Sequence, residues 1–327
     1  MSGSSDFSSL GLAVGHATDV AGATGLTVIR MLEAEPAMRG AAAIVGRATA
    51  TREVPTVTAD HVAKRVDAIL LTGGSAYGLD AAAGVMRWME ERGRGFPIAG
   101  GVVPIVPAAA VFDLAPLGRF DVRPTAQMAY DACERATTHE IAEGSVGAGT
   151  GCTVGKAAGR GHAMKGGVGC ALERQGDVIV AAVAVVNAFG DVRDGNGRII
   201  AGARDASGTW LDSAAVIEQA SLGGAPAPAT AGAPQTTLCA IATNVHFSGH
   251  DLQQLARASS AALYKRITPA GTAFDGDIVF AMGPQGAGAS APLPSVEILA
   301  VRALESAIER AVRFAKGRDG IPGLADA

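Results

Sequence analysis

The sequence feature that most constrains the fold is a break in the residue pattern at positions 221–235. This stretch reads SLGGAPAPATAGAPQ, and its Pro, Ala and Gly residues offer few side chains to bury. Such a composition is typical of a flexible connector or a surface loop. It ends at Thr236, the first residue of the strongly β-like run TTLCAIATNV. The stretch 236–327 holds too few elements for an autonomous domain, so we expect residues 1–235 and 236–327 to form one fold.

Apolar runs of strand type and longer amphipathic stretches alternate irregularly along the chain. Strands are expected at 25–30, 41–48, 67–75, 169–192, 237–245 and 277–283, with hairpin turns at 175–177 and 194–197. Helices are expected at about 76–92, 124–139, 250–264 and 294–316, the last with Pro294 in its first turn. Because strands and helices do not alternate strictly, the pattern favours an α+β fold, with stacked sheets flanked by helices, over a Rossmann-type sheet.

Composition narrows the class of protein. With 327 residues, of which 48% are hydrophobic, the chain can bury a large core, and its formal net charge is -4. Basic residues are scattered and aromatic residues are only 4%, so we expect no nucleic acid and no anionic membrane as partner. No signal peptide and no run of 18 apolar residues is visible, and the four cysteines form no CxxC pair. These features predict a cytoplasmic protein with free, buried thiols.

Motifs for phosphate, dinucleotide and metal binding are not met. In GAGTGCTVGKA (147–157), Gly149 and Gly155 are one position too far apart for a P-loop, and Ala157 stands where Ser or Thr would bind magnesium. His246 and His250 are four residues apart, but no Glu accompanies them. The sequence therefore predicts no cofactor and no metal.

Four polar residues in apolar or glycine-rich surroundings are candidates for a site. Asn187 lies inside VAVVNAFGDV, where a buried amide either ties down a neighbouring loop or serves as a catalytic donor. Lys156 follows glycines whose backbone N–H groups can approach a substrate, although a lysine there is more often solvated. Asp275 and Asp277 lie between apolar segments at a strand entrance, which favours a buried charged partner over a solvent-facing turn.

Together these segments resemble the DmpA-type N-terminal-nucleophile peptidases, which include β-aminopeptidases and the 6-aminohexanoate-oligomer (nylon) endohydrolase. The resemblance is carried by TGGSAYGLDAAAGV (72–85), GAGTGCTVGK (147–156), AVAVVNAFGDV (182–192), TTLCAIATNV (236–245) and TPAGTAFDGDIVFAMG (268–283). The TTxxAIxTNV and DGD patterns are more similar to the nylon hydrolase branch.

The resemblance implies a four-layer αββα sandwich, made as one precursor that cuts itself into an α chain (1–235) and a β chain (236–327). It also implies tetramers of αβ units. Thr236 matches the nucleophile, which becomes the new N-terminus once its bond to Gln235 is cut. Three positions match residues that line the site: Tyr77, Lys156 and Asn187. Two match the acidic pair that assists self-cleavage and holds the new amine: Asp275 and Asp277.

The chemistry of these residue types fits such roles. A threonine hydroxyl needs a base, and because Thr236 has no free amine in the precursor, we expect Asp275 or Asp277 to serve the first cut. The freed α-amine, with a reference pKa of about 7.7–8.0, is then a base close to neutral pH. We expect Asn187 and an N–H of a glycine stretch to hold the oxyanion, and Tyr77 to orient the amide or protonate the leaving amine.

Two departures from the family pattern keep alternatives open. Gln235 stands where the nylon hydrolase has Asn and the aminopeptidases have Gly, and the acidic pair is Asp-x-Asp where β-aminopeptidases have Ser-x-Glu. Expected substrates are therefore peptides with an N-terminal L-, D- or β-amino acid, or linear ω-amide oligomers. The alternatives are an acetyltransferase of the ornithine acetyltransferase type, and an uncleaved, catalytically silent homologue that acts as a binding or scaffold protein.

Overall fold

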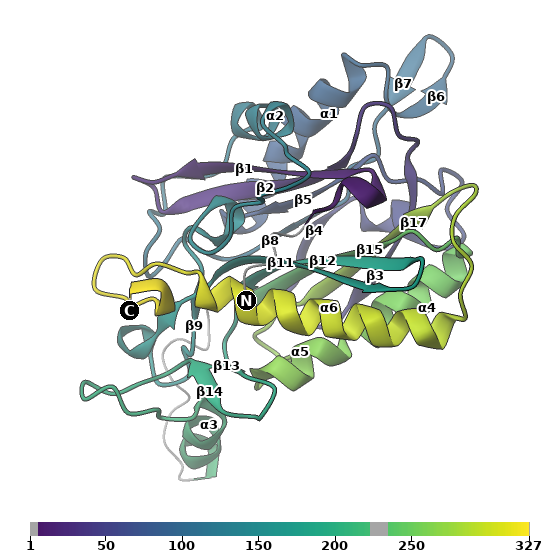
Figure 1. Ribbon diagram of the computed structural model, residues 1–327. Helices are drawn as coiled ribbons and strands as arrows, with labels where there is room; N and C mark the ends of the chain where they lie inside the picture. Colours follow the sequence, from purple (N-terminus) through teal and green to yellow (C-terminus); the bar gives the residue numbers. More distant parts are fainter. Residues whose placement is uncertain (1–5, 223–234, 327) are drawn as a thin grey trace.

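Two five-stranded sheets dominate the computed structural model, which describes residues 6–222 and 235–326 (Figure 1). The first sheet has the order β1 (Leu12–Asp19), β2 (Thr24–Met31), β5 (Ala68–Thr72), β8 (Ala108–Ala110) and β4 (Ala50–Arg52). The second has the order β11 (Gly167–Gln175), β12 (Val178–Asn187), β15 (Thr236–Thr243), β17 (Ile278–Pro284) and β3 (Met38–Ile44).

Helices and short strands complete the architecture. The α-helices are α1 (Ala82–Glu90), α2 (Ala126–Glu134), α3 (Ser213–Leu222), α4 (Gly249–Ser259), α5 (Ala261–Arg266) and α6 (Leu293–Arg313). The short strands are β6 (Phe96–Ile98), β7 (Gly101–Val103), β9 (Thr153–Val154), β10 (Met164–Lys165), β13 (Asp191–Arg193), β14 (Ile199–Ala201) and β16 (Ile267–Thr268). The 3-10 helices are η1 (Ser8–Leu10), η2 (Val54–Val57), η3 (Ser75–Ala81), η4 (Gly147–Gly149), η5 (Arg160–His162) and η7 (Leu324–Asp326).

The second sheet joins the stretches before and after residue 235. β15 pairs antiparallel with β12 on one side and parallel with β17 on the other, and β17 pairs with β3. Strands from both stretches thus form one continuous ladder. Of the Pro/Ala/Gly tract at 221–235, residues 223–234 lie outside the described part of the chain.

Strand periodicity sorts the buried side chains of this sheet into two cores. In β15, Leu238 and Ala240 contribute to the core shared with the first sheet, whereas Cys239 and Ile241 contribute to the core shared with α4, α5 and α6. Successive strand residues point to opposite faces, which is why a continuous apolar run suits a strand that is covered on both faces. A third core lies between the first sheet and helices α1 and α2.

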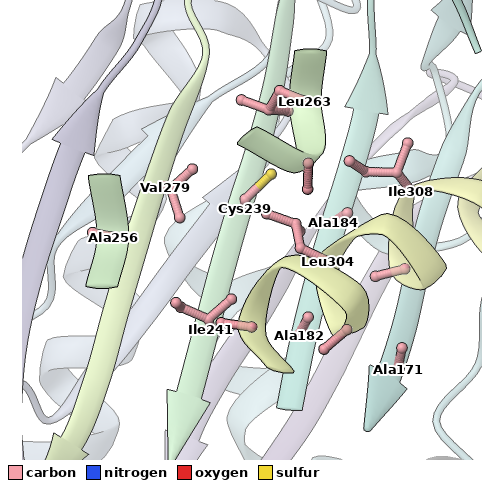
Figure 2. Close-up of a cluster of buried hydrophobic side chains, with 14 of the residues drawn as sticks. Ala171, Ala182, Ala184, Cys239, Ile241, Ala256, Leu263, Val279, Leu304 and Ile308 are labelled. Carbon is pink, nitrogen blue, oxygen red and sulfur yellow. The ribbon is translucent and has the colours of Figure 1, made fainter. Parts of the chain in front are cut away.

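Glycines let α6 approach the second sheet closely. A Cβ atom at Gly169 of β11 would lie 2.1 Å from the Ala307 carbonyl oxygen of α6, so a larger residue there would push the helix away. Figure 2 shows Leu304 and Ile308 of this helix lying over the small residues Ala182 and Ala184 of β12. Large side chains on the helix therefore face small ones on the sheet.

The structure confirms the predicted α+β class and most predicted elements. Strands form at every predicted run, both hairpin turns are present, and α6 carries a proline in its first turn as expected. The expectation of free, buried cysteines is also confirmed. Several elements were not predicted: the strands β1, β4, β6, β7, β8, β9, β10 and β16, and the helix α3.

Three helix predictions were wrong in extent. The first begins as η3, because residues 73–78 fold back so tightly that a Cβ at Gly78 would lie 1.8 Å from the Gly73 carbonyl oxygen. The second is shorter than predicted, and the third is divided at Ser260 into α4 and α5. Within residues 6–222 and 235–326, no helix combines the length and the apolar character needed to cross a membrane.

The core beneath α6 gives a stability prediction. Leu304 is fully buried, so Leu304→Ala should lower the free energy of unfolding by about 2–5 kcal/mol, because it removes apolar contacts and leaves a cavity. Urea denaturation of the purified protein measures this change. Ile298→Ala is the matched control on the same helix: its side chain is 62% exposed, and the expected change is within about 0.5 kcal/mol. Equal losses for the two variants would contradict the assignment of the buried face.

Candidate active site

Five of the predicted site residues lie together where the second sheet meets its neighbouring loops. Thr236 begins β15 and is the register partner of Asn187, the last residue of β12. Asp275 and Asp277 lie on the turn before β17, and Lys156 follows β9. All five are buried, with at most 2% of each residue exposed. The ends of neighbouring strands therefore place these polar side chains next to one another.

Lys156 and Asn187 are joined in a network of hydrogen bonds. The Lys156 ammonium donates to the side-chain oxygen of Asn187 at 2.9 Å and to its backbone oxygen at 3.0 Å. The side-chain oxygen also accepts from the Thr153 N–H at 3.0 Å, and the Asn187 amide nitrogen donates to the Phe112 carbonyl at 3.0 Å. Asn187 thus connects two loops to the end of β12. The interpretation of Lys156 as a solvated lysine was wrong, because its side chain is buried and hydrogen-bonded to Asn187.

The turn that carries Asp275 and Asp277, which we call the acidic turn, is held by hydrogen bonds to its backbone and to its carboxylates. The Asp277 carboxylate accepts from the Thr237 N–H at 2.6 Å, and the Asp275 carboxylate accepts from the Thr272 N–H at 2.8 Å. The Gly46 N–H donates to the Asp277 carbonyl at 3.0 Å, and a Cβ at Gly46 would lie 2.1 Å from the Asp275 carbonyl oxygen. The close approach of this glycine segment fixes the turn against the end of β3.

The peptide unit before Thr236 is held by the same turn. The Gln235 N–H donates to the Phe274 carbonyl at 2.8 Å, and the Gln235 carbonyl accepts from the Gly276 N–H at 2.6 Å. A Cβ at Gly276 would lie 2.8 Å from the Thr236 hydroxyl oxygen, so glycine is needed there for the turn to approach the threonine. The donor to the Gln235 carbonyl is therefore the Gly276 N–H, on the turn that also carries Asp275 and Asp277.

Burial moves three proton-binding groups of this cluster toward neutral pH. It lowers the pKa of the Lys156 ammonium to about 7. It raises the pKa of the Asp277 carboxyl to about 7, with the nearby charge of Asp275 adding to the effect, and it raises the pKa of Asp275 as well. Groups that titrate close to neutral pH can take up and release protons during a reaction, and such groups gather at catalytic sites.

Comparison with known proteins decides the family. The profile of Peptidase family S58 matches residues 10–322, a range that includes all five buried residues. The chain belongs to peptidase family S58. An uncharacterized aminopeptidase of Mycobacterium tuberculosis is 40% identical over 305 residues, covering 89% of this chain and 81% of the relative. A 6-aminohexanoate-oligomer endohydrolase of Kocuria sp. is 34% identical over 218 residues, covering 66% of this chain and 59% of that protein.

Solved structures show the same fold. The L-aminopeptidase D-Ala-esterase/amidase of Ochrobactrum anthropi, described as a variant of the Ntn hydrolase fold, matches with a TM-score of 0.68 at 18% identity. The match covers 95% of this chain and 86% of that one. The predicted family is therefore confirmed, and the S58 chain is a hydrolase of peptide or amide bonds with an Ntn-hydrolase-type α+β fold.

Tyr77 is placed differently from the other predicted residues of the S58 chain. It lies on η3, and its side chain is 58% exposed. The Arg123 guanidinium lies over its ring, 4.0 Å from the centroid. No hydrogen bond among residues 6–222 and 235–326 joins Tyr77 to the buried cluster, and the same ranges contain no group of three or more His, Cys, Asp or Glu residues suited to a metal ion.

Two buried charged residues next to the cluster were not predicted from the sequence. Lys165 donates to the carbonyls of Thr150 and Cys152 at 3.0 and 2.6 Å, which holds the turn that leads to Thr153. The Asp113 carboxylate accepts from the Thr24 hydroxyl at 2.6 Å and from the Gly74 N–H at 2.7 Å. Asp113 lies in the apolar run AAAVFDLAP. A polar residue within an apolar run is the pattern by which Asn187 was predicted, and the same pattern could have identified Asp113.

The buried Lys165 gives a second stability prediction. Lys165→Met removes the donor to three buried carbonyls, those of Gly149, Thr150 and Cys152, and each loss should cost about 1–3 kcal/mol of the free energy of unfolding. Urea denaturation measures the change, with Lys316→Met as control because Lys316 is exposed. If both variants unfold at the wild-type midpoint, Lys165 does not hold this turn.

Proposed function

We propose that this S58 chain cuts its own bond between Gln235 and Thr236, and that Thr236 then hydrolyses small peptides or amide oligomers through an acyl-enzyme. The α chain would be residues 1–235 and the β chain residues 236–327. The observation that carries the proposal is the bond from the Gly276 N–H to the Gln235 carbonyl, on a turn that approaches the Thr236 hydroxyl closely. A donor on the attacked carbonyl stabilises the oxyanion that forms there.

The first cut needs a base other than the α-amine, which is still part of a peptide bond. In the proposed step Asp277 or Asp275 takes the Thr236 hydroxyl proton, and the oxygen attacks the Gln235 carbonyl carbon. The C–N bond then breaks and the nitrogen is protonated, which leaves Gln235 as an ester on the threonine oxygen. Water hydrolyses this ester to a Gln235 carboxylate and frees the hydroxyl. Holding both reacting groups on one backbone raises their effective concentration greatly.

The second reaction uses the new N-terminus. The α-amine of Thr236 takes the hydroxyl proton as the hydroxyl oxygen attacks the substrate carbonyl carbon, and the leaving amine receives a proton as the C–N bond breaks, which leaves the acyl group as an ester on Thr236. Water then hydrolyses this ester, which releases the carboxylic acid product and restores the Thr236 hydroxyl. The buried Lys156 ammonium lowers the pKa of that amine by repulsion, and the Asp277 carboxylate opposes this effect. Asn187 is proposed as an oxyanion donor and Tyr77 as the group that orients the substrate amide or protonates its leaving amine.

The proposed fold is the four-layer αββα sandwich of the family. Its support is the presence of three separate cores: one between the two sheets, one beneath α4–α6, and one beneath α1 and α2. Assembly of αβ units into tetramers is proposed on family resemblance.

Replacement of the nucleophile tests self-cleavage. Thr236→Val keeps the shape of the side chain but lacks the hydroxyl, so the chain should remain whole, whereas wild type should yield residues 1–235 and 236–327. Thr236→Ser keeps a hydroxyl and should still be cut. Mass spectrometry under denaturing conditions measures all three proteins. Cleavage of the valine variant at this bond would contradict the proposal, and an uncut wild type would favour the silent homologue.

The rate of self-cleavage should depend on pH. Because the pKa of Asp277 is raised to about 7, its carboxylate form is depleted below neutrality, and the rate should fall about tenfold per pH unit below pH 7 and level off above it. An ordinary carboxyl would give a flat profile over this range. Timed gel analysis of freshly made precursor measures the rate.

Two variants separate Asp277 from Lys156, which titrates in the same range. Asp277→Asn should slow the cut by about 10²–10⁴, the usual contribution of a positioned base. Lys156→Met should keep the pH step. A profile that loses its step only in Lys156→Met would assign the base to the lysine instead.

The acetyltransferase alternative predicts a different product. It would transfer acetyl groups from acetylornithine, whereas the proposed hydrolase releases free amines from aminoacyl p-nitroanilides. The match to Peptidase family S58 favours hydrolysis.

A further inference from the structure

The direction of the Asn187 amide nitrogen depends on its hydrogen bond to Phe112. The amide oxygen accepts from the Lys156 ammonium and the Thr153 N–H, whereas the nitrogen donates to the Phe112 carbonyl at 3.0 Å. An amide nitrogen carries two hydrogens in one plane, so a bond through one of them fixes the direction of the other. In the described part of the chain (6–222 and 235–326), this second hydrogen has no acceptor. The Phe112 carbonyl therefore determines where Asn187 can donate to a substrate.

The Phe112 carbonyl lies between two anchored residues. On one side, the Val111 N–H donates to the Thr72 carbonyl at 2.8 Å, and the Val111 carbonyl accepts from the Ser75 N–H at 2.9 Å. On the other side is Asp113, whose side chain is fully buried. The position of the carbonyl thus depends on how firmly both neighbours are held.

Asp113 binds two separate segments with its two carboxylate oxygens. Its Oδ2 accepts from the Thr24 hydroxyl at 2.6 Å, at the start of β2, and its Oδ1 accepts from the Gly74 N–H at 2.7 Å, just before η3. A Cβ at Gly73 would lie 2.1 Å from Oδ2, so the carboxylate is closely packed against this turn. Because η3 carries Tyr77, one carboxylate connects the segment that orients Asn187 with the element that carries Tyr77.

We propose that Asp113 is a positioning residue for amide hydrolysis, which holds the Asn187 amide and the element that carries Tyr77 in a fixed relation so that both meet the same substrate. This inference rests on the proposed function, in which Asn187 is an oxyanion donor and Tyr77 orients the substrate amide or protonates its leaving amine. Asp113 acts through these two residues. Preorganised donors stabilise a transition state only while their direction is held.

Burial makes the two hydrogen bonds of Asp113 costly to lose. It raises the pKa of the Asp113 carboxyl to about 6, and hydrogen bonds from Thr24 and Gly74 oppose this rise. The group is therefore a carboxylate at neutral pH, and its charge strengthens both hydrogen bonds. Gly74 is buried as well, so removal of the carboxylate would leave its N–H without an acceptor. The segment would then move to satisfy this group, and the Phe112 carbonyl would move with it.

Asp113→Ala, which removes both hydrogen bonds, tests the proposal. For the aminoacyl p-nitroanilide that wild type cuts fastest, kcat should fall about 10- to 100-fold and KM should change by less than about threefold, because a misplaced donor weakens transition-state binding. Self-cleavage should go to completion, since Gly276 rather than Asn187 donates to the carbonyl attacked in the first cut. A wild-type kcat, or a loss confined to KM, would overturn the proposal.

Asp67→Ala is the matched control. Asp67 is fully buried, and its carboxylate accepts from the Ile105 N–H at 2.9 Å, but it precedes β5 whereas Gly73 and Gly74 follow that strand. Its loss removes a comparable buried acceptor far along the same strand, so kcat should stay at the wild-type value. An equal fall of kcat in Asp67→Ala and Asp113→Ala would show a general effect of destabilisation and overturn the positioning role.

Asp113→Asn separates position from charge. Asparagine keeps an oxygen for the Gly74 N–H, and its nitrogen can donate to the Thr24 hydroxyl, so kcat should stay within about threefold of wild type. If Asp113→Asn were as impaired as Asp113→Ala, the effect would belong to the charge and the proposal would fail. Should the alanine variant not fold, Thr24→Val removes one of the two hydrogen bonds and should lower kcat about threefold or more, and a wild-type kcat there would overturn the proposal.

A crystal structure of Asp113→Ala shows the displacement directly. The Asn187 amide nitrogen and the Phe112 carbonyl oxygen should lie beyond hydrogen-bond distance, and an unchanged 3.0 Å contact would overturn the proposal whatever the kinetics. Intact-mass analysis distinguishes this failure from failure of the proposed function. An uncut wild type contradicts self-cleavage at Thr236, whereas a cut Asp113→Ala with wild-type kcat contradicts only the role of Asp113.

Discussion

The hydrogen bond from the Gly276 N–H to the Gln235 carbonyl is the contact on which the account of this site depends. It joins the acidic turn before β17 to the peptide unit just before β15, at 2.6 Å. Because β15 and β17 are neighbouring parallel strands in the centre of one sheet, the contact follows from the register of that sheet. The packing of the second sheet thus determines how closely the turn can approach Thr236, and glycines at 46 and 276 are what that approach requires.

Burial also determines the acid–base properties of the side chains in this site. Taking an ammonium and two carboxylates out of water is costly unless each is hydrogen-bonded or paired, and here backbone N–H groups and Asn187 supply the partners. The remaining cost appears as pKa values close to neutrality for Lys156 and Asp277. The apolar strands and helices that cover both faces of the sheet therefore shift the pKa values of the polar residues at its end. In this way the packing of the core affects the acid–base chemistry of the site.

Much of this site could be predicted from the sequence, because its side chains lie in short, distinctive segments. Asn187 was recognisable as an amide within an apolar run, and Asp275 and Asp277 as carboxylates with apolar flanks. The backbone contacts of Gln235 could not be predicted, since they depend on strand register across distant parts of the chain. Lys165 was not predicted for a similar reason. It donates hydrogen bonds to backbone carbonyls of a turn, and such contacts require no particular residues next to the lysine in the sequence. The start of η3 was mispredicted because tight backbone contacts at Gly73 and Gly78 outweigh an amphipathic pattern.

The claim that unites fold and chemistry is that one residue, Thr236, comes to hold both a nucleophilic hydroxyl and a free amine. N-terminal sequencing of the active, purified wild-type protein measures this most directly. The account predicts a second sequence, Thr-Thr-Leu-Cys, in equal molar amount with the sequence of the original N-terminus. Full amide-hydrolase activity in a preparation that yields only the original N-terminus would contradict it.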